Sequence, residues 1–226
     1  EKTGRKAVAE LANEYRAELI QDAEVLENPE KYYDQIIEID LSRLEPHVNG
    51  PYSPDAAIPI SELADVVHKN QYPEKLDAAL VGSCTNSSYE DLTRAASIAQ
   101  QAVDHNVSAQ SELLITPGSE QIKKTCERDG VLQKFEQING TIMANACGPC
   151  IGQWRRQMKN PERKNSILNS YNRNFAKRND GNPNTHSFVA SPEIVTAMSL
   201  AGTLTFNPLK DELTDNKGNH FILDEP

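Results

Sequence analysis

The sequence has only four cysteines among 226 residues, too few for disulfides to hold a chain of this size together. Three of them, Cys84, Cys147 and Cys150, form a C-x62-C-x2-C pattern, while Cys126 lies in a charged segment with helical spacing. Secreted domains that depend on disulfides carry many more cysteines for their length. We therefore expect a reduced, intracellular setting.

Long apolar runs and a surplus of basic residues are also missing. No run approaches the roughly 20 apolar residues of a membrane-spanning helix. The 33 acidic and 23 basic side chains give a formal net charge of -10, so neither nucleic acid nor an anionic membrane is expected as a partner. The N-terminus has no initiator Met, apolar signal segment or Arg/Ser-rich transit pattern, and we expect it to be a cut or processed start.

The first 45 residues differ in pattern from the rest of the chain. Helical spacing of Ala, Leu and Tyr predicts an amphipathic helix over residues 5–20. Apolar and acidic residues alternate over residues 33–41, which predicts a half-buried strand. Proline and glycine punctuate residues 46–54, so we expect a domain boundary there, with residues 1–45 on one side and residues 46–226 on the other.

Strands and helices alternate regularly beyond this boundary. Strands are expected over residues 77–82, 112–116, 141–144, 166–170 and 187–190. Helices are expected over residues 89–103, 119–137 with a break near Gly130, and 192–201. This alternation favours right-handed βαβ crossovers and an α/β fold, a three-layer αβα arrangement around a mainly parallel sheet.

Polar and cysteine-bearing segments follow these strands directly. In parallel sheets of this kind, ligands bind outside the carboxyl ends of the strands. Four segments should therefore converge on one edge of the sheet: Cys84, the loop Thr116–Ser119, the pair Cys147/Cys150, and Asn172/Arg173.

Three thiolates on one edge can hold three corners of an iron–sulfur cube. A [4Fe–4S] cluster used only for electron transfer normally has four Cys ligands, whereas three ligands leave one iron open as a Lewis acid. The same spacing allows half of a zinc site, a redox pair at Cys147 and Cys150, or buried structural thiols. Zinc would need a fourth ligand, and no His or other Cys has a convincing spacing. Spacing alone favours the cluster and leaves the other three open.

Two arginines, Arg173 and Arg178, follow the strand expected over residues 166–170. Arginines on loops usually form solvated surface pairs. A guanidinium, however, offers a planar fork that matches a carboxylate. Two arginines beside an open iron would suit a substrate that carries several carboxylates.

Five segments of the sequence resemble motifs of the aconitase family, and they occur in the family's order along nearly the whole chain. They are Gly82–Asp91, Thr116–Gln121, Ala144–Trp154, Ser170–Asp180 and Ser191–Ala197. The similarity is greatest to the mitochondrial-type branch of the family. It implies that residues 46–226 are the cluster-carrying domain, like the family's third domain, and that residues 1–45 end the preceding domain.

The resemblance also implies a chemistry. Cys84, Cys147 and Cys150 would bind a [4Fe–4S] cluster, and Asn172, Arg173 and Arg178 would contact the tricarboxylate citrate or isocitrate. The reaction implied is the reversible conversion of citrate to isocitrate, by dehydration to cis-aconitate and rehydration, in the mitochondrial matrix or otherwise in the cytoplasm.

The chain also departs from the family pattern. No catalytic acid, base or serine of the family is found in it, so the remaining aconitase domains are implied partners and the segment by itself is expected to be inactive. Arg155 stands where many relatives carry an acid, and Met158 falls in a usually polar segment. A related dehydratase of the homoaconitase or isopropylmalate isomerase type, or a non-enzymatic cluster- or zinc-binding module, stays open.

Overall fold

The computed structural model describes residues 5–226, and the chain divides into two compact units between Leu44 and Glu45. The first unit contains short helices with no buried side chain: α1 (Lys6–Glu14), α2 (Arg16–Leu19), α3 (Ala23–Glu27) and the 3-10 helix η1 (Pro29–Lys31). The helix predicted over residues 5–20 is confirmed, with an interruption at Tyr15.

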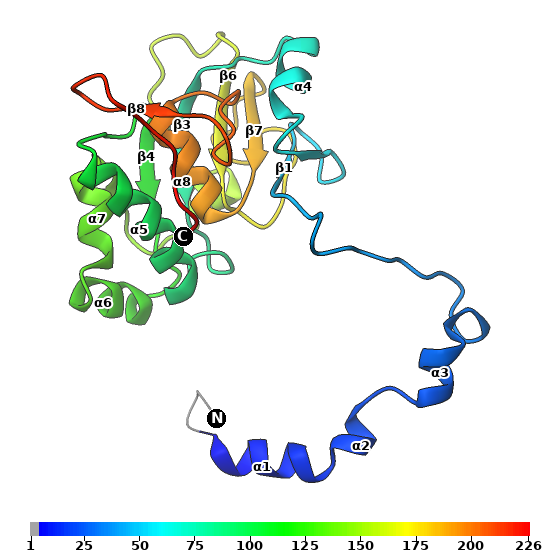
Figure 1. Ribbon diagram of the computed structural model, residues 1–226. Helices are drawn as coiled ribbons and strands as arrows, with labels where there is room; N and C mark the ends of the chain where they lie inside the picture. The colour runs from blue at the N-terminus through cyan, green and yellow to red at the C-terminus, as the bar shows by residue number, and fades with distance from the viewer. Residues whose placement is uncertain (1–4) are drawn as a thin grey trace. The chain divides into compact units, whose positions relative to one another are not determined.

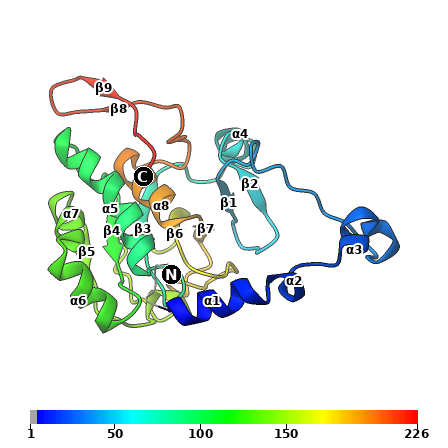
Figure 2. The same cartoon turned by 60° about the horizontal axis from the view of Figure 1, so that its bottom comes forward.

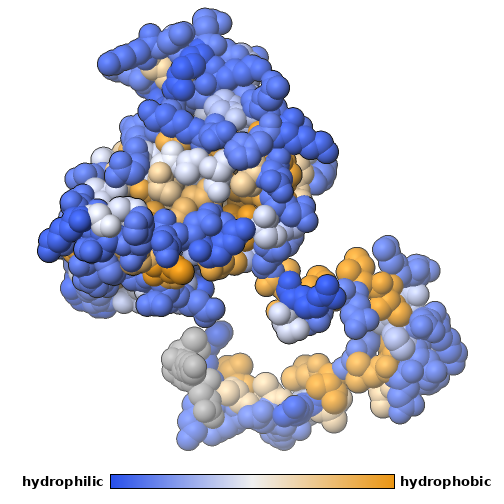
Figure 3. Space-filling view, turned by 45° about the horizontal axis from the view of Figure 1, so that its top comes forward, coloured by the Kyte–Doolittle hydropathy of each residue, from blue (hydrophilic) through white to orange (hydrophobic). Residues whose placement is uncertain are grey.

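The strand predicted over residues 33–41 is wrong, because this segment has no regular secondary structure. A strand needs a neighbour that pairs with its backbone groups, and no described strand pairs with this segment. Its apolar side chains are exposed, Ile37 by 74% and Leu41 by 77%. Figure 3 shows apolar residues, in orange, at several places on the surface of the first unit.

The second unit is built on a seven-stranded sheet in the order β2-β1-β7-β6-β3-β4-β5 (Figure 1). The strands are β1 (His47–Asn49), β2 (Ala57–Pro59), β3 (Leu76–Val81), β4 (Glu112–Ile115), β5 (Thr141–Ile142), β6 (Asn165–Asn169) and β7 (Thr185–Val189). β7, β6, β3, β4 and β5 run parallel, and β1 and β2 add an antiparallel edge. The mainly parallel α/β sheet is therefore confirmed.

Helices pack against the sheet through a large apolar core (Figures 1 and 2). They are α4 (Leu63–Lys69), α5 (Tyr89–Asp104), α6 (Glu120–Arg128), α7 (Val131–Gln137) and α8 (Pro192–Ala201). The break predicted near Gly130 is confirmed: Gly130 has φ +72° between α6 and α7, a backbone conformation that glycine adopts without strain. Phe135 and Phe188 are fully buried in this core.

A second, smaller apolar cluster contains Ala78, Leu80, Leu114 and Ile167 of the sheet, with Tyr171 beyond the end of β6. Met143, Cys150 and Trp154 pack against it. The segment that carries the cysteine pair thus covers part of the sheet, in keeping with the expected three-layer arrangement. A small hairpin, β8 (Leu213–Thr214) with β9 (His220–Phe221), completes the unit. Among residues 5–226, no helix is both long and apolar enough to cross a membrane.

His186 provides a test of the packing near the amino end of β7. It is buried between the rings of Tyr52 and Tyr72, whose centroids lie 4.9 and 5.6 Å from its own. Burial lowers the pKa of His186, against a weaker opposing hydrogen bond with the Asn184 carbonyl. The folded state therefore disfavours the imidazolium, whereas the unfolded chain binds a proton near pH 6.5. This contribution to stability is complete above pH 6.5 and is lost as the pH falls from that value toward the lower folded pKa.

We expect the His186→Gln variant to lose less unfolding free energy between pH 7 and pH 5 than the parent protein loses. Urea unfolding at several pH values measures the difference. Parallel pH profiles for the two proteins would show that His186 is not held neutral by burial.

Candidate metal centre

One cavity brings the three predicted cysteines together. It has a volume of about 100 Å³ and is lined by Ser83, Cys84, Thr116, Pro117, Gly118, Asn145, Ala146, Cys147, Cys150 and Tyr171. These residues follow β3, β4, β5 and β6 in the chain. The predicted convergence of Cys84, the 116–119 loop and the cysteine pair at one edge of the sheet is therefore confirmed.

Cys84 lies in a loop that is fixed at both of its ends. Ser83 has φ +78°, and the Asn86 Nδ2 donates to the Ser170 carbonyl at 2.6 Å. At the start of α5 the Ser88 hydroxyl accepts a hydrogen bond from the Asp91 amide, and the Asp91 carboxylate accepts from the Ser88 amide, which is a capping box. The hydroxyl-bearing residue directly before α5 therefore provides its cap. Within this loop the Cys84 side chain is exposed and lines the cavity.

Removing this cap with Ser88→Ala should lower the free energy of unfolding by about 1 kcal/mol, because an amide of the first turn loses its acceptor. Thr93→Ala is the matched control on the same helix, where the hydroxyl bonds only to the helical carbonyl of Glu90 and the change should stay within about 0.5 kcal/mol. Urea unfolding measures both. Equal losses would show that the cap contributes nothing specific.

The cysteine pair lies on a tight turn. The 3-10 helix η2 (Pro149–Ile151) follows Cys147, whose carbonyl accepts from the Ile151 amide at 3.0 Å. The turn ends at Gly152 with φ +78°. Cys147 is exposed, and Cys150 is partly buried beside Tyr171, whose pKa is raised by its own burial. The phenol of Tyr171 therefore stays neutral.

Arg178 connects this turn to the segment with the other predicted arginine. It is 6% exposed, and its Nε donates to the Cys150 carbonyl at 2.9 Å. Its Nη2 donates to the Cys150 Sγ at 3.1 Å and to the Asn172 Oδ1 at 2.9 Å, and its Nη1 donates to the Arg173 carbonyl. Asn172 and Arg173 themselves are exposed. The structure thus joins Asn172, Arg173 and Arg178 to the cysteine turn.

Three cysteine sulfurs are among the groups that line the cavity, and thiolates are the usual protein ligands of iron–sulfur clusters. Among the described residues, no three His, Cys, Asp or Glu side chains lie close enough together to hold a single metal ion. The three cysteine sulfurs are the candidate metal ligands of this cavity.

Comparison with known proteins shows which family the chain belongs to. The model of the aconitase family (aconitate hydratase) matches residues 1–202. The chain belongs to the aconitase family. It is 57% identical to the mitochondrial aconitate hydratase of Aspergillus fumigatus, 53% to the probable mitochondrial aconitate hydratase of Dictyostelium discoideum and 51% to the mitochondrial enzyme of Saccharomyces cerevisiae. Each alignment covers 99% or more of this chain and 28% of the relative. The aconitase-family chain thus spans little more than a quarter of the length of these relatives.

Two side chains with buried polar contacts near the cysteine turn or on the sheet of this aconitase-family chain were not among the residues predicted from sequence. Asn179 is 1% exposed and donates to the Pro149 carbonyl of the cysteine turn at 3.1 Å. Arg156 is buried between Asp77 and Asp180. Contacts of this kind join residues far apart in the sequence, and no local pattern indicates which carbonyl or carboxylate a side chain will meet.

Proposed function

We propose that this chain is the cluster-binding part of an aconitate hydratase, with Cys84, Cys147 and Cys150 as ligands of a [4Fe–4S] cluster. The observation that carries the proposal is that these three cysteines line one cavity at the carboxyl edge of the parallel sheet. Their number is the second support, since three protein thiolates leave one iron without a cysteine. Relatives at 51–57% identity named aconitate hydratase are the third.

When bound, such a cluster supplies an open, Lewis-acidic iron. The chain's own contribution is to bind and orient the tricarboxylate. The Arg173 guanidinium is exposed and can pair with a substrate carboxylate. Arg178 uses four of its five N–H groups in the contacts described above, which leaves one Nη1 N–H for a carboxylate. With Asn172, these residues would hold citrate or isocitrate in one orientation, which supplies part of the rate of a reversible dehydration through cis-aconitate.

Two further assignments belong to this proposal. Residues 46–226 would be the cluster domain, and residues 1–45 would be the end of a preceding domain. The apolar side chains that residues 1–45 expose would pack within that preceding domain. The setting would be the mitochondrial matrix, since the relatives are named as mitochondrial. The catalytic acid and base would come from the remaining aconitase domains, because none is assigned within this chain.

The test uses the protein at its full natural length, reconstituted with iron and sulfide without air. It is assayed with citrate and isocitrate, and separately with homocitrate and isopropylmalate as alternative substrates. Interconversion of citrate and isocitrate in preference to the other two acids is the expected result. Turnover of only homocitrate or isopropylmalate would mean that this acid, and not citrate, is the substrate. Stoichiometric zinc without acid-labile sulfide would mean that the chain is part of a zinc-binding module and not of an aconitate hydratase.

Arg173 allows a sharper test of substrate binding. Arg173→Gln removes a charge-assisted contact worth about 1.5–3 kcal/mol, so kcat/KM for citrate should fall by about 10- to 150-fold. Lys177→Gln removes another exposed charge from the same segment and should change kcat/KM by less than threefold, about the effect of an exposed charge. Equal losses in the two variants would mean that the segment acts through its general charge and not through Arg173.

A further inference from the structure

The turn that carries Cys147 and Cys150 has little internal structure to keep it in place. It is a single 3-10 turn of three residues, closed by backbone bonds to Cys147 and Gly148. A turn of this length cannot fix its own orientation against the sheet. Its position must therefore come from neighbouring residues, and that position decides whether both sulfurs face the cavity.

Residues 178 and 179 provide that support. The Asn179 Nδ2 donates to the Pro149 carbonyl at 3.1 Å, and the Asn179 carbonyl accepts from the Trp154 amide at 3.3 Å. Arg178 bonds to the carbonyl and the sulfur of Cys150. A Cβ on Gly152 would lie 3.1 Å from the Arg178 carbonyl, so the two backbones are in close contact. All the side-chain hydrogen bonds described here that hold the turn therefore come from one dipeptide, beside the apolar packing of Cys150 on the sheet.

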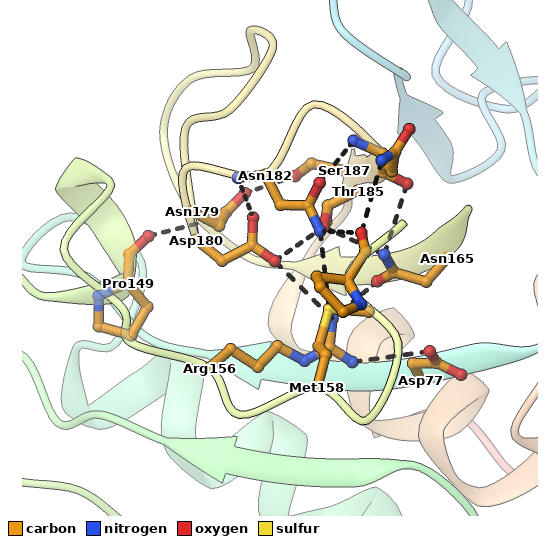
Figure 4. A network of polar contacts seen from close by, with 12 residues as sticks. Asp77, Pro149, Arg156, Met158, Asn165, Asn179, Asp180, Asn182, Thr185 and Ser187 are labelled. Atoms are coloured by element: carbon orange, nitrogen blue, oxygen red, sulfur yellow. Dashed lines mark hydrogen bonds and ion pairs between the residues drawn. The ribbon is translucent and has the colours of Figure 1, made fainter. Parts of the chain in front are cut away.

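Asn179 in turn is fixed to the sheet. Its Oδ1 accepts from the Ser187 hydroxyl on β7 at 2.7 Å (Figure 4). The Asn169 Nδ2 on β6 donates to the same hydroxyl at 3.0 Å. Asn179 is 1% exposed, so these bonds lie out of reach of water. One buried amide group therefore connects two strands of the sheet with the turn that holds two of the three cysteines.

The geometry points to Asn179 as a positioning residue of the cluster: it holds the Cys147–Cys150 turn in the orientation that binding requires, without touching cluster or substrate. This inference rests on the proposed function, since it presumes that the turn binds a cluster. Replacing Asn179 leaves all three cysteines and the exposed Arg173 in place. The bound state should nevertheless lose iron faster, because the turn moves out of position more often.

The experiment uses the full-length protein loaded with cluster under anaerobic conditions. Iron release to a ferrous chelator is followed over time, and the three-iron EPR signal is recorded after mild oxidation. We expect Asn179→Ala to release iron about tenfold faster than the parent, as the loss of two buried hydrogen bonds implies. Asn179→Asp keeps the shape and the acceptor for Ser187 but sets an oxygen against the Pro149 carbonyl, so it should also release iron faster, and it serves as the second variant if Asn179→Ala does not fold.

Asn207→Ala is the matched control. Asn207 is a buried asparagine, 6% exposed, whose Oδ1 accepts from the Leu209 amide two residues further along the same loop. It should lower the melting temperature of the apo-protein by an amount similar to that in the Asn179 variants, while its iron release stays within about twofold of the parent. Iron release within twofold of the parent in both Asn179 variants, or equal acceleration in Asn207→Ala, would overturn the inference. A parent protein that binds no iron or sulfide would instead overturn the proposed function, so the two failures are distinguishable.

Discussion

Replacing Cys84 by serine is expected to lower citrate turnover by the full-length protein by about 1,000-fold or more. The substitution removes one of three sulfurs on the cavity and leaves a weaker, harder ligand in its place. Cys84 is exposed and forms no disulfide, so the loss should not come from unfolding. Anaerobic reconstitution, iron and sulfide analysis, and the three-iron EPR signal after mild oxidation measure the effect. A normal three-iron signal in Cys84→Ser would show that the ligand assignment is wrong.

Cys126→Ser is the control for the loss of a thiol as such. Cys126 is fully buried on α6 and is not among the residues that line the cavity, and burial raises its pKa, so it stays a neutral thiol. Its replacement buries a hydroxyl and should lower stability by about 1–3 kcal/mol. The cluster and its signals should remain. A loss of cluster equal to that of Cys84→Ser would mean that the two thiols act through the fold alone.

Removing the buried guanidinium of Arg156 is expected to lower the free energy of unfolding by about 3 kcal/mol or more. Arg156 and Asp180 have side chains 8% and 3% exposed, with Nη1 and Oδ2 3.9 Å apart, and Arg156 Nη2 lies 3.8 Å from the Asp77 carboxylate (Figure 4). Its Nη1 also donates to the Asn165 Oδ1 at 2.7 Å. Arg156→Met fills the space but leaves the Asp180 carboxylate buried without its cation.

The neighbouring arginine is a matched control for this prediction. Arg155 is exposed, so Arg155→Met should change the free energy of unfolding by no more than about 0.5 kcal/mol. Urea unfolding of both variants at pH 7 measures the difference. Equal effects would show that the ion pairs of Arg156 do not stabilise the fold.

The parallel core of the fold could be predicted from sequence because its signals are local. Short β-branched and leucine-rich runs predicted β3, β4 and β6, and helical periodicity predicted α5. Each of these segments carries enough apolar residues to show its period. The strand ends then placed the cysteines on one edge without knowledge of any contact.

The other features of the fold and of the site depended on contacts between segments, which the sequence of one segment does not show. β1 and β2 have three residues each within a proline-rich stretch, too short for an alternating pattern to be visible. Residues 33–41 have the pattern of a strand but no neighbour among the described strands, so the local signal predicted a structure that pairing does not support. The positions of Asn179 and Arg156 depend on long-range hydrogen bonds and ion pairs, which a single sequence does not encode locally.

Mössbauer spectroscopy of the full-length protein, loaded with ⁵⁷Fe and sulfide without air, most directly tests the three-cysteine cluster. Four irons and four sulfides per chain are expected, with one iron distinct from the other three and altered when citrate is added. Stoichiometric zinc without sulfide, or four irons that citrate leaves unchanged, would contradict a cluster held by Cys84, Cys147 and Cys150 with one iron open to substrate.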